Sequence, residues 1–520
     1  MIENFLTATR LPWTPPDSVN EETLHFYDNL KIPSIKGKPC LLLHRLNTER
    51  NSNVDILFHA EQHQIICNTS GSGKTLLLFE GLCQHWGFYF VGARDSNGIG
   101  AWDLETMIGI MPDIPGWSVN IFEDHSNPTK AALRANEAKH KANEAIAFTR
   151  ISRVLLARWI VFDAFIKVAK KLKGGALDEE TLIYNCLVGA SHEVLMRLDS
   201  QFGPEKILGP TFKDSFLYVL DEAQTAGNEH EEAFADVNGE VPLPVLYPII
   251  QKLAERTNVK IIVSGTGFPS GLVRTVLATS VCKDGPSWTT VHAIGDFTSK
   301  DAQLTYISQY LPPSFFLSPS GIDLKTRIYG WLRGRHRVTA RYLEEVLKGN
   351  WMENHPASPH KLLNAYIQCF TNFTPCDSEM SLLNQEADVD AETLNIGGFE
   401  WDKIRLEPNL LSALSNGVYG YITRGEYPTW KSGHELLVEY GLASYIDNKK
   451  TTTIQEPIAL VGIVRYFESH NLVVGEDNHA LELLPHTTLV SAPHAQEFLN
   501  LLSRSLPGKS RGEVDDKAGS

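Results

Sequence analysis

The chain has no long hydrophobic run. None of its apolar stretches reaches the roughly 18 residues that a bilayer-spanning helix requires, and the most hydrophobic segment, residues 159–169, is interrupted by Asp163 and Lys167. The first 13 residues lack a basic segment followed by an apolar one, so we expect no secretory signal. These absences predict an intracellular protein of the cytoplasm or nucleus without membrane partners, although export by an unconventional route stays open.

Paired cysteines and an excess of positive charge are absent as well. The 7 cysteines form no C-x-x-C pair, and they stand at Cys40, Cys67, Cys83, Cys186, Cys282, Cys369 and Cys376. This odd, scattered set indicates free buried thiols in a reducing compartment rather than disulfides or zinc ligands. The formal net charge of −15 disfavours nonspecific binding to nucleic acids.

Short apolar runs alternate with helical patterns along the first 300 residues. The short apolar runs are Ile65–Cys67, Phe88–Val91, Phe216–Leu220, Lys260–Ser264 and Thr289–Ile294, and they read as strands. Phe88–Val91 reads as a strand buried on both faces. This alternation predicts an α/β fold in which helices flank a parallel sheet. Between the second and third runs, residues 128–200 contain a helical insertion rich in Ala, Glu, Lys and Arg.

The length of 520 residues exceeds what one hydrophobic core organises, so we expect several domains. The predicted divisions are an irregular leader at 1–55, the α/β core at 56–298, a helical lid at 299–350, a mainly helical domain at 351–505 and a disordered tail at 506–520. The domain at 351–505 could take the form of a winged helix.

A glycine-rich turn follows the first apolar run. Asn68-Thr69-Ser70-Gly71-Ser72-Gly73-Lys74-Thr75 matches the phosphate-binding pattern G-x-x-x-x-G-K-[ST], except that Asn68 replaces the first glycine. Gly71 and Gly73 allow the loop to curve so that its N–H groups point at a phosphate, beside the N-terminus of the next helix. We expect Lys74 to hold the β- and γ-oxygens and Thr75 to hold Mg²⁺. Asn68 is expected to fit because asparagine tolerates a positive φ.

Two acids end the third apolar run. Val219-Leu220-Asp221-Glu222-Ala223-Gln224 has the form of a Walker B segment, with its carboxylates at the sheet edge where α/β folds bind ligands. Asp221 is expected to hold Mg²⁺ through water, and Glu222 to orient or deprotonate the attacking water. After the next run, Ser264 or Thr266 would contact that water or the γ-phosphate, the sensor-1 role. This order is typical of P-loop NTPases of the additional-strand class.

The one dense basic segment lies at residues 325–341 and contains no acid. Three readings stay open: a solvated helix face, a lid element that reaches the γ-phosphate, or a contact with nucleic-acid phosphates. Gly334 interrupts the helical pattern, and Arg335 and Arg337 beside it are the residues that we expect to act on the γ-phosphate.

Several strings in this chain are shared with a known family. Residues 68–78, 81–90, 220–224, 264–267, 332–341 and 456–460 resemble the ATPase module of Crinkler-type proteins of fungi and oomycetes, and retrotransposon hot spot proteins have a related module. The resemblance covers roughly residues 60–470. It implies a P-loop ATPase followed by a helical or winged-helix region, and effector or conflict roles. The family often adds a nuclease, but no nuclease constellation follows residue 350 here, so we expect no DNA cleavage.

Together these observations predict an ATP hydrolase that uses Mg²⁺ and couples turnover to a conformational change. One alternative is a nucleotide-gated switch or scaffold with little turnover, which the Asn68 departure allows. Another is a DNA-stimulated remodelling ATPase, because Asp221-Glu222-Ala223-Gln224 is similar to helicase motif II. No guanine-reading N-K-x-D string occurs, which favours ATP. Expected partners are the nucleotide and a protein or a second copy of the chain, and DNA stays open.

Overall fold

The chain folds into two units. The computed structural model describes residues 12–16, 20–46, 48, 52–93, 99–122, 130–172, 216–235, 241–255, 259–266, 288–349, 358–375, 394, 398–431, 433–447 and 450–470. Unit 1 comprises the described residues within 1–14, 27–296 and 431–452, and unit 2 those within 15–26, 297–430 and 453–520. Helix α2 (Glu21–Leu30) and strand β12 (Thr452–Thr453) cross the division between the units.

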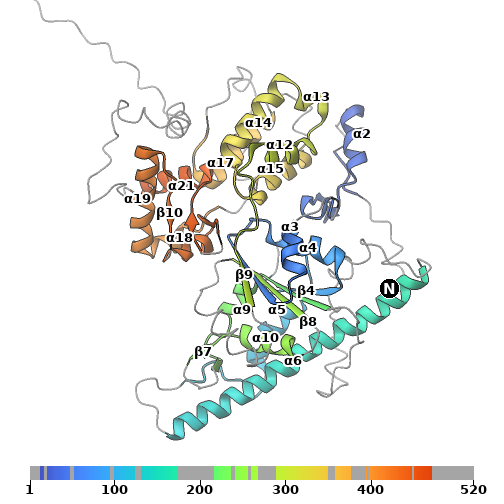
Figure 1. Ribbon diagram of the computed structural model, residues 1–520, viewed down its shortest axis with the longest axis vertical. Helices are drawn as coiled ribbons and strands as arrows, with labels where there is room; N and C mark the ends of the chain where they lie inside the picture. Colours follow the sequence, from blue (N-terminus) through green and yellow to red (C-terminus); the bar gives the residue numbers. More distant parts are fainter. Residues whose placement is uncertain are drawn as a thin grey trace, which may run out of the picture. The chain divides into compact units, whose positions relative to one another are not determined.

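Unit 1 contains a 5-stranded sheet in the order β4-β5-β8-β3-β9 (Figure 1). The strands are β3 (His63–Cys67), β4 (Gly87–Val91), β5 (Phe216–Asp221), β8 (Val259–Gly265) and β9 (Trp288–Val291). All four pairings are parallel. Strand β8 lies between β3 and β5, so an extra strand separates the glycine-rich loop from the acidic pair. The parallel α/β sheet of the additional-strand class is thereby confirmed.

The register of the sheet brings the predicted site residues to one edge. Cys67 pairs with Gly265, and Leu220 pairs with Val263. Because parallel strands all end at the same edge, the loop after β3, the acids after β5 and the polar residues at the end of β8 meet there.

The two faces of the sheet are covered by different helices. Side chains alternate between the faces of a strand. On one face, Tyr89 and Val219 belong to a core with Leu78 of helix α4 (Lys74–Gln84) and Leu57 of helix α3 (Ser52–Phe58). This double burial explains why the strands read as continuous apolar runs rather than alternating ones.

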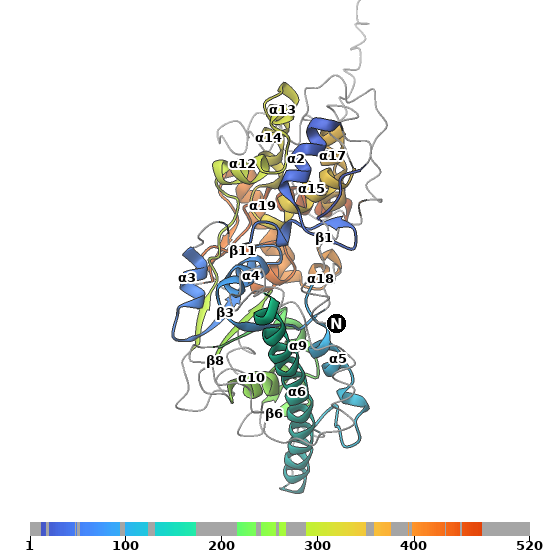
Figure 2. The ribbon, with the colours of Figure 1, turned by 90° about the vertical axis from the view of Figure 1, so that its right-hand side faces the viewer.

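The opposite face is aromatic and packs against helix α6 (Lys130–Leu172), which has 43 residues. Trp159 of α6 lies 4.9 Å from Phe88 and 4.6 Å from Phe216, measured between ring centroids. In Figures 1 and 2, α6 also lies beside α10 (Leu246–Ala254). The helix predicted after residue 128 is therefore confirmed for 130–172, whereas 173–200 lies outside the described residues.

The remaining elements of unit 1 are short. They are β1 (Ser34–Ile35), β2 (Lys38–Pro39), η1 (Leu41–Leu43), α5 (Asp103–Gly109), η2 (Met111–Asp113), α9 (Ala223–Asn228), β6 (Phe234–Ala235), β7 (Pro242–Leu243), α20 (Glu435–Glu439) and β11 (Ser444–Tyr445). The last two belong to the segment 431–452, which returns to unit 1 from the far end of the sequence. We refer to the described residues of this segment as the strap.

The N-terminal stretch differs from the irregular leader that we expected. It contains α2, a ten-residue helix whose first turn carries Glu21 and Glu22. The side-chain oxygen of Asn20 accepts a hydrogen bond from the Thr23 N–H at 2.9 Å, which caps the helix start. Pro12, Pro15, Pro16, Pro33 and Pro39 all lie outside this helix.

Unit 2 is mainly helical in its described residues. Its elements are α12 (Lys300–Ser308), α13 (Pro313–Phe316), α14 (Pro319–Leu332), α15 (His336–Gly349), α17 (Ser358–Thr371), α18 (Trp401–Arg405), α19 (Pro408–Arg424), β10 (Thr429–Trp430) and α21 (Pro457–Ser469). Trp331, Tyr342 and Tyr366 are fully buried between these helices. Helices α12 to α15 occupy the segment for which we expected a helical lid. The winged-helix form stays a prediction, and the expected tail lies outside the described residues. Among the helices that the structure describes, none combines the length and apolar character of a membrane span.

Candidate functional site

The glycine-rich loop has the backbone that phosphate binding requires. Gly71 has φ +83° and Gly73 has φ +101°, in the left-handed region that a side chain would strain. Helix α4 begins at Lys74, immediately after Gly73. The loop therefore ends at the N-terminus of an 11-residue helix, where amide groups and the helix dipole favour an anion.

Asn68 does not adopt the backbone that we expected. It is not among the described non-glycine residues with positive φ, so tolerance of that region is not the reason for asparagine here. Its side-chain amide instead forms four hydrogen bonds. Nδ2 donates to the carbonyl oxygens of His292 at 2.8 Å and Tyr445 at 3.2 Å. Oδ1 accepts from the N–H groups of Thr69 at 2.7 Å and Tyr445 at 3.1 Å.

Lys74 is buried at the site and is held by the loop itself. Its Nζ donates to the carbonyl oxygens of Asn68 and Thr69, both at 2.8 Å, and lies 3.4 Å from Thr266 Oγ1. Ser72 Oγ also donates to the Thr69 carbonyl at 2.8 Å. These hydrogen bonds place the Lys74 ammonium group at the loop, where it could meet a bound polyphosphate.

Asp221, the aspartate of the predicted Walker B segment, lies directly beside the loop. Asp221 is 1% exposed, and its Oδ2 accepts hydrogen bonds from Thr75 Oγ1 and Tyr89 Oη, both at 2.8 Å. Oδ1 accepts from the Glu222 N–H at 3.0 Å. The structure thus brings together Thr75 and Asp221, which are 146 positions apart in the sequence.

Tyr89 was not among the predicted site residues. In the sequence, Tyr89 is one residue of an apolar run that predicts a strand. No local pattern indicates that its hydroxyl group contacts the site. Its backbone is fixed by Arg158 of α6, whose Nη1 donates to the Tyr89 carbonyl at 2.7 Å. Arg158 also forms a buried ion pair with Asp103 at 2.6 Å, with side chains 1% and 2% exposed.

Glu222 is connected to strand β8 through Gln224. Glu222 has φ +51°, an uncommon backbone for a non-glycine residue, and it is the N-cap residue that precedes helix α9. Gln224 Nε2 donates to Glu222 Oε2, and Gln224 Oε1 accepts from the Thr266 N–H at 3.1 Å. The carboxylate is therefore held in a defined orientation relative to the end of β8.

Two buried hydroxyl groups at this edge have no hydrogen-bond partner among the described residues. Thr69 is 1% exposed and Ser264 is 0% exposed, and both side-chain oxygens are unsatisfied. Buried polar atoms are normally hydrogen-bonded, so such atoms call for an explanation such as a bound ligand or water.

The donor set at this edge fits Mg²⁺ rather than a metal held entirely by protein. Thr75 and Asp221 could offer oxygen ligands, and no cluster of three or more His, Cys, Asp or Glu side chains suited to a metal occurs in the described part of the chain. Mg²⁺ is commonly bound by one or two protein oxygens together with substrate phosphates and water.

Comparison with known proteins adds little to this geometry. The chain matches no model of a known protein family and no curated protein. Among solved structures, it is similar to a Walker-type ATPase of Pyrococcus abyssi at 13% identity and a TM-score of 0.36, covering 79% of this chain and 94% of the other. The assignment of the fold rests on the sheet described above, and the resemblance to Crinkler-type proteins stays a prediction.

The two arginines expected at the γ-phosphate lie in unit 2. Arg335 is bound to Glu456: Nε donates to Oε1 at 2.7 Å, and Nη2 donates to Oε2 at 2.6 Å. Gly334 allows this approach, because a Cβ there would lie 2.5 Å from Glu456 Cγ. Arg337 is exposed in the first turn of α15. The structure gives Arg335 an intramolecular partner, and the action of both arginines on a nucleotide stays a prediction.

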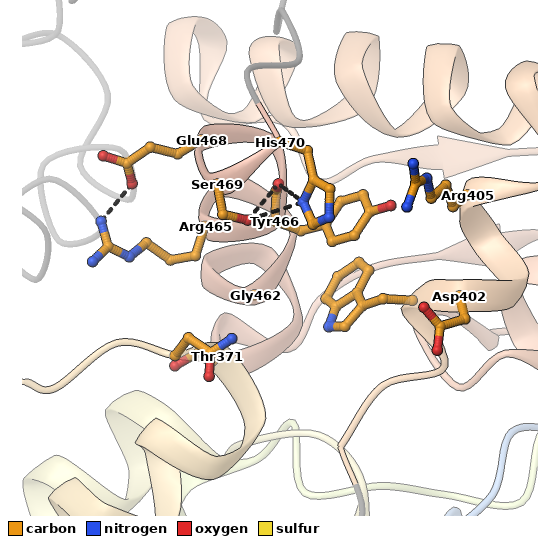
Figure 3. Close-up of a pocket in the computed structure, with 11 residues that line it drawn as sticks. Thr371, Asp402, Arg405, Gly462, Arg465, Tyr466, Glu468, Ser469 and His470 are labelled. Carbon is orange, nitrogen blue, oxygen red and sulfur yellow. Dashed lines mark hydrogen bonds and ion pairs between the residues drawn. The ribbon is translucent and has the colours of Figure 1, made fainter.

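Unit 2 also contains a cavity of about 350 Å³ (Figure 3). The rings of Trp401 and Tyr466 stack in its lining with centroids 4.6 Å apart. The ring centroid of His470, the C-cap residue that follows α21, lies 4.3 Å from that of Tyr466. Arg465 in the lining is paired with Glu468. None of the site residues predicted from the sequence lies in this lining, so the cavity is a feature separate from the phosphate loop.

Proposed function

We propose that this protein binds ATP with Mg²⁺ at the edge of the sheet in unit 1 and hydrolyses it. The contact between Thr75 and Asp221 at 2.8 Å carries the proposal, because it joins the phosphate loop to the acidic strand. This convergence of an ammonium group, a glycine-rich turn at a helix N-terminus and two carboxylates is the arrangement that phosphoryl transfer from a nucleotide uses.

Each residue then has a defined task. The amides of the loop and the N-terminus of α4 attract the phosphates, and the Lys74 ammonium moves from the carbonyls of Asn68 and Thr69 to the β- and γ-oxygens. Thr75 and Asp221 would hold the metal. When bound, Mg²⁺ neutralises charge on the β- and γ-phosphates.

Glu222 is the proposed base for the attacking water. Its position after the metal-binding aspartate and its fixed orientation through Gln224 support this role. The buried, unsatisfied hydroxyl of Ser264 and the Thr266 side chain at the end of β8 are proposed to contact the water or the γ-phosphate. The coupling of turnover to a conformational change and the effector or conflict role also belong to the proposal.

The test is a pair of variants measured for both ATP binding and steady-state turnover. Lys74→Ala removes a charged partner of the phosphates, so we expect ATP affinity to fall on the order of 100-fold. Glu222→Gln keeps the size of the side chain and removes the base, so turnover should fall on the order of 100- to 10,000-fold while ATP still binds.

The matched control for Glu222→Gln is Glu231→Gln, which makes the same change at an exposed position. It should leave turnover unchanged. ATP binding to the wild type without turnover would favour the nucleotide-gated switch, and many-fold stimulation by added DNA would favour a DNA-remodelling ATPase. Absence of ATP binding by the wild type would refute the proposal.

A further inference from the structure

The strap is held on the phosphate loop by the one residue that departs from the phosphate-binding pattern. Asn68 and Tyr445 form a reciprocal pair: Asn68 Nδ2 donates to the Tyr445 carbonyl at 3.2 Å, and the Tyr445 N–H donates to Asn68 Oδ1 at 3.1 Å. The Asn68 side chain therefore donates to and accepts from the backbone of strand β11, as the backbone of a neighbouring strand would. A glycine, which the ordinary pattern has at this position, could form neither bond.

Further contacts make this junction rigid. Tyr445 is 3% exposed, and its ring lies 4.7 Å from the His292 ring, which follows β9. His292 Nδ1 donates to the Cys67 carbonyl at 2.8 Å, and its own carbonyl accepts from Asn68. The strap is thus joined to the last residue of β3 and the first residue of the loop.

The same residue also contacts the phosphate-binding lysine. The Asn68 carbonyl accepts from Lys74 Nζ at 2.8 Å, while the Asn68 side chain holds the Thr69 N–H and the strap. A polyphosphate that draws the ammonium away and orders the loop changes the surroundings of Asn68 directly. Both ends of the strap continue into residues of unit 2, at 430 and 453.

We propose that Asn68 couples occupancy of the phosphate loop to docking of the strap, so that a bound nucleoside triphosphate holds the strap more firmly. This inference rests on the proposed function and adds a regulatory contact to the same site. Asn68 acts as a positioning residue, because it orders the loop and the strap without itself providing a reacting group. By linkage, a docked strap favours the loop conformation that binds nucleotide.

Hydrogen–deuterium exchange of the full-length protein tests the coupling. The probe is a nonhydrolysable ATP analogue with Mg²⁺ at saturating concentration, with its binding measured separately by calorimetry. In the wild type, exchange of the Tyr445 amide should slow on the order of tenfold when the analogue binds. In Asn68→Gly it should be on the order of tenfold faster than in the wild type without analogue, and insensitive to the analogue.

Two further variants keep the test decisive. Asn68→Ala removes the same side-chain hydrogen bonds but leaves the backbone less flexible than glycine does. It should also show faster exchange of the Tyr445 amide that is insensitive to the analogue, and it serves as the test if the glycine variant folds poorly. Asn53→Ala is the matched control, because Asn53 Nδ2 donates to the Ile294 carbonyl at 3.3 Å, a long-range amide-to-carbonyl contact in the same unit. In Asn53→Ala, the Tyr445 amide should exchange at the same rate as in the wild type.

Two results would overturn the inference. Unchanged exchange of the Tyr445 amide in both Asn68 variants would mean that the side chain does not hold the strap. If the exchange rate of the Tyr445 amide in the wild type does not change when the analogue binds, the strap is docked but is not coupled to occupancy of the loop. If the analogue does not bind the wild type at all, the proposed function fails. The comparison of the wild type with the Asn68 variants, all without analogue, then still decides whether Asn68 holds the strap.

Discussion

Replacing Tyr89 by phenylalanine removes a single hydroxyl group from the surroundings of Asp221. That hydroxyl donates to Asp221 Oδ2 at 2.8 Å, and Tyr89 is only 3% exposed, so water does not readily take its place. The ring keeps its shape and its packing in the core. The variant therefore isolates the hydrogen bond that orients the proposed metal-binding carboxylate.

The size of the effect follows from the kind of bond that is lost. A hydrogen bond to a charged group contributes about 1.5–3 kcal/mol, and removing a partner that orients a metal ligand costs about 10- to 100-fold in metal affinity or activity. These two figures agree, since about 1.4 kcal/mol corresponds to a factor of ten. We therefore expect the Mg²⁺ concentration for half-maximal ATP turnover to rise about 10- to 100-fold in Tyr89→Phe.

The assay is a Mg²⁺ titration of ATP turnover at saturating ATP, with Tyr366→Phe as the matched control. Tyr366 is fully buried in unit 2, and its hydroxyl donates to the Val338 carbonyl at 2.8 Å. The control loses an equally short hydrogen bond to a neutral acceptor, so its Mg²⁺ requirement should not change. A requirement within about twofold of the wild type in Tyr89→Phe would refute the positioning of Asp221 by this hydroxyl.

Three other perturbations follow from the described contacts. Gln224→Leu releases Glu222 and should lower the single-turnover rate about 10- to 100-fold with little change in ATP affinity, and an unchanged rate would contradict the orienting role. Asp103→Ala leaves Arg158 buried without its carboxylate, so urea denaturation should show a loss of about 3–5 kcal/mol, and a loss below about 1 kcal/mol would count against it. Burial lowers the pKa of His63 to about 4 from 6.5, so the unfolded chain binds a proton that the folded chain does not. The contribution of His63 to stability should fall by about 3 kcal/mol as the pH drops from 6.5 to 4, and His63→Asn should remove that share of the pH dependence.

The sequence predicted the backbone of the glycine-rich loop because the requirements of such a turn are local. Gly71 and Gly73 are read directly as positions that need a positive φ, and Lys74 follows them at the start of a helix. The apolar runs before Asp221 and Ser264 were read as strands, and parallel strands place such residues at one edge.

The interpretation of Asn68 shows where local rules fail. Asparagine was explained by its tolerance of positive φ, whereas its side chain bonds a residue 377 positions away. Nothing near Asn68 or Tyr445 in the sequence marks this contact. No local pattern marks the partner of Arg335 either: it is Glu456, 121 positions further on, and the action of Arg335 on a phosphate stays a prediction.

The sequence by itself determined the strands, the glycine-rich loop and the position of the acids at the end of β5, because glycine geometry, apolar runs and the start of a helix are properties of neighbouring residues. Only the tertiary structure decided that Tyr89 holds Asp221, that Gln224 joins Glu222 to β8, and that the strap returns to the loop. The physical reason is that a hydrogen bond between distant residues depends on how strands and helices pack, and ordinary side chains such as tyrosine and asparagine serve many other roles.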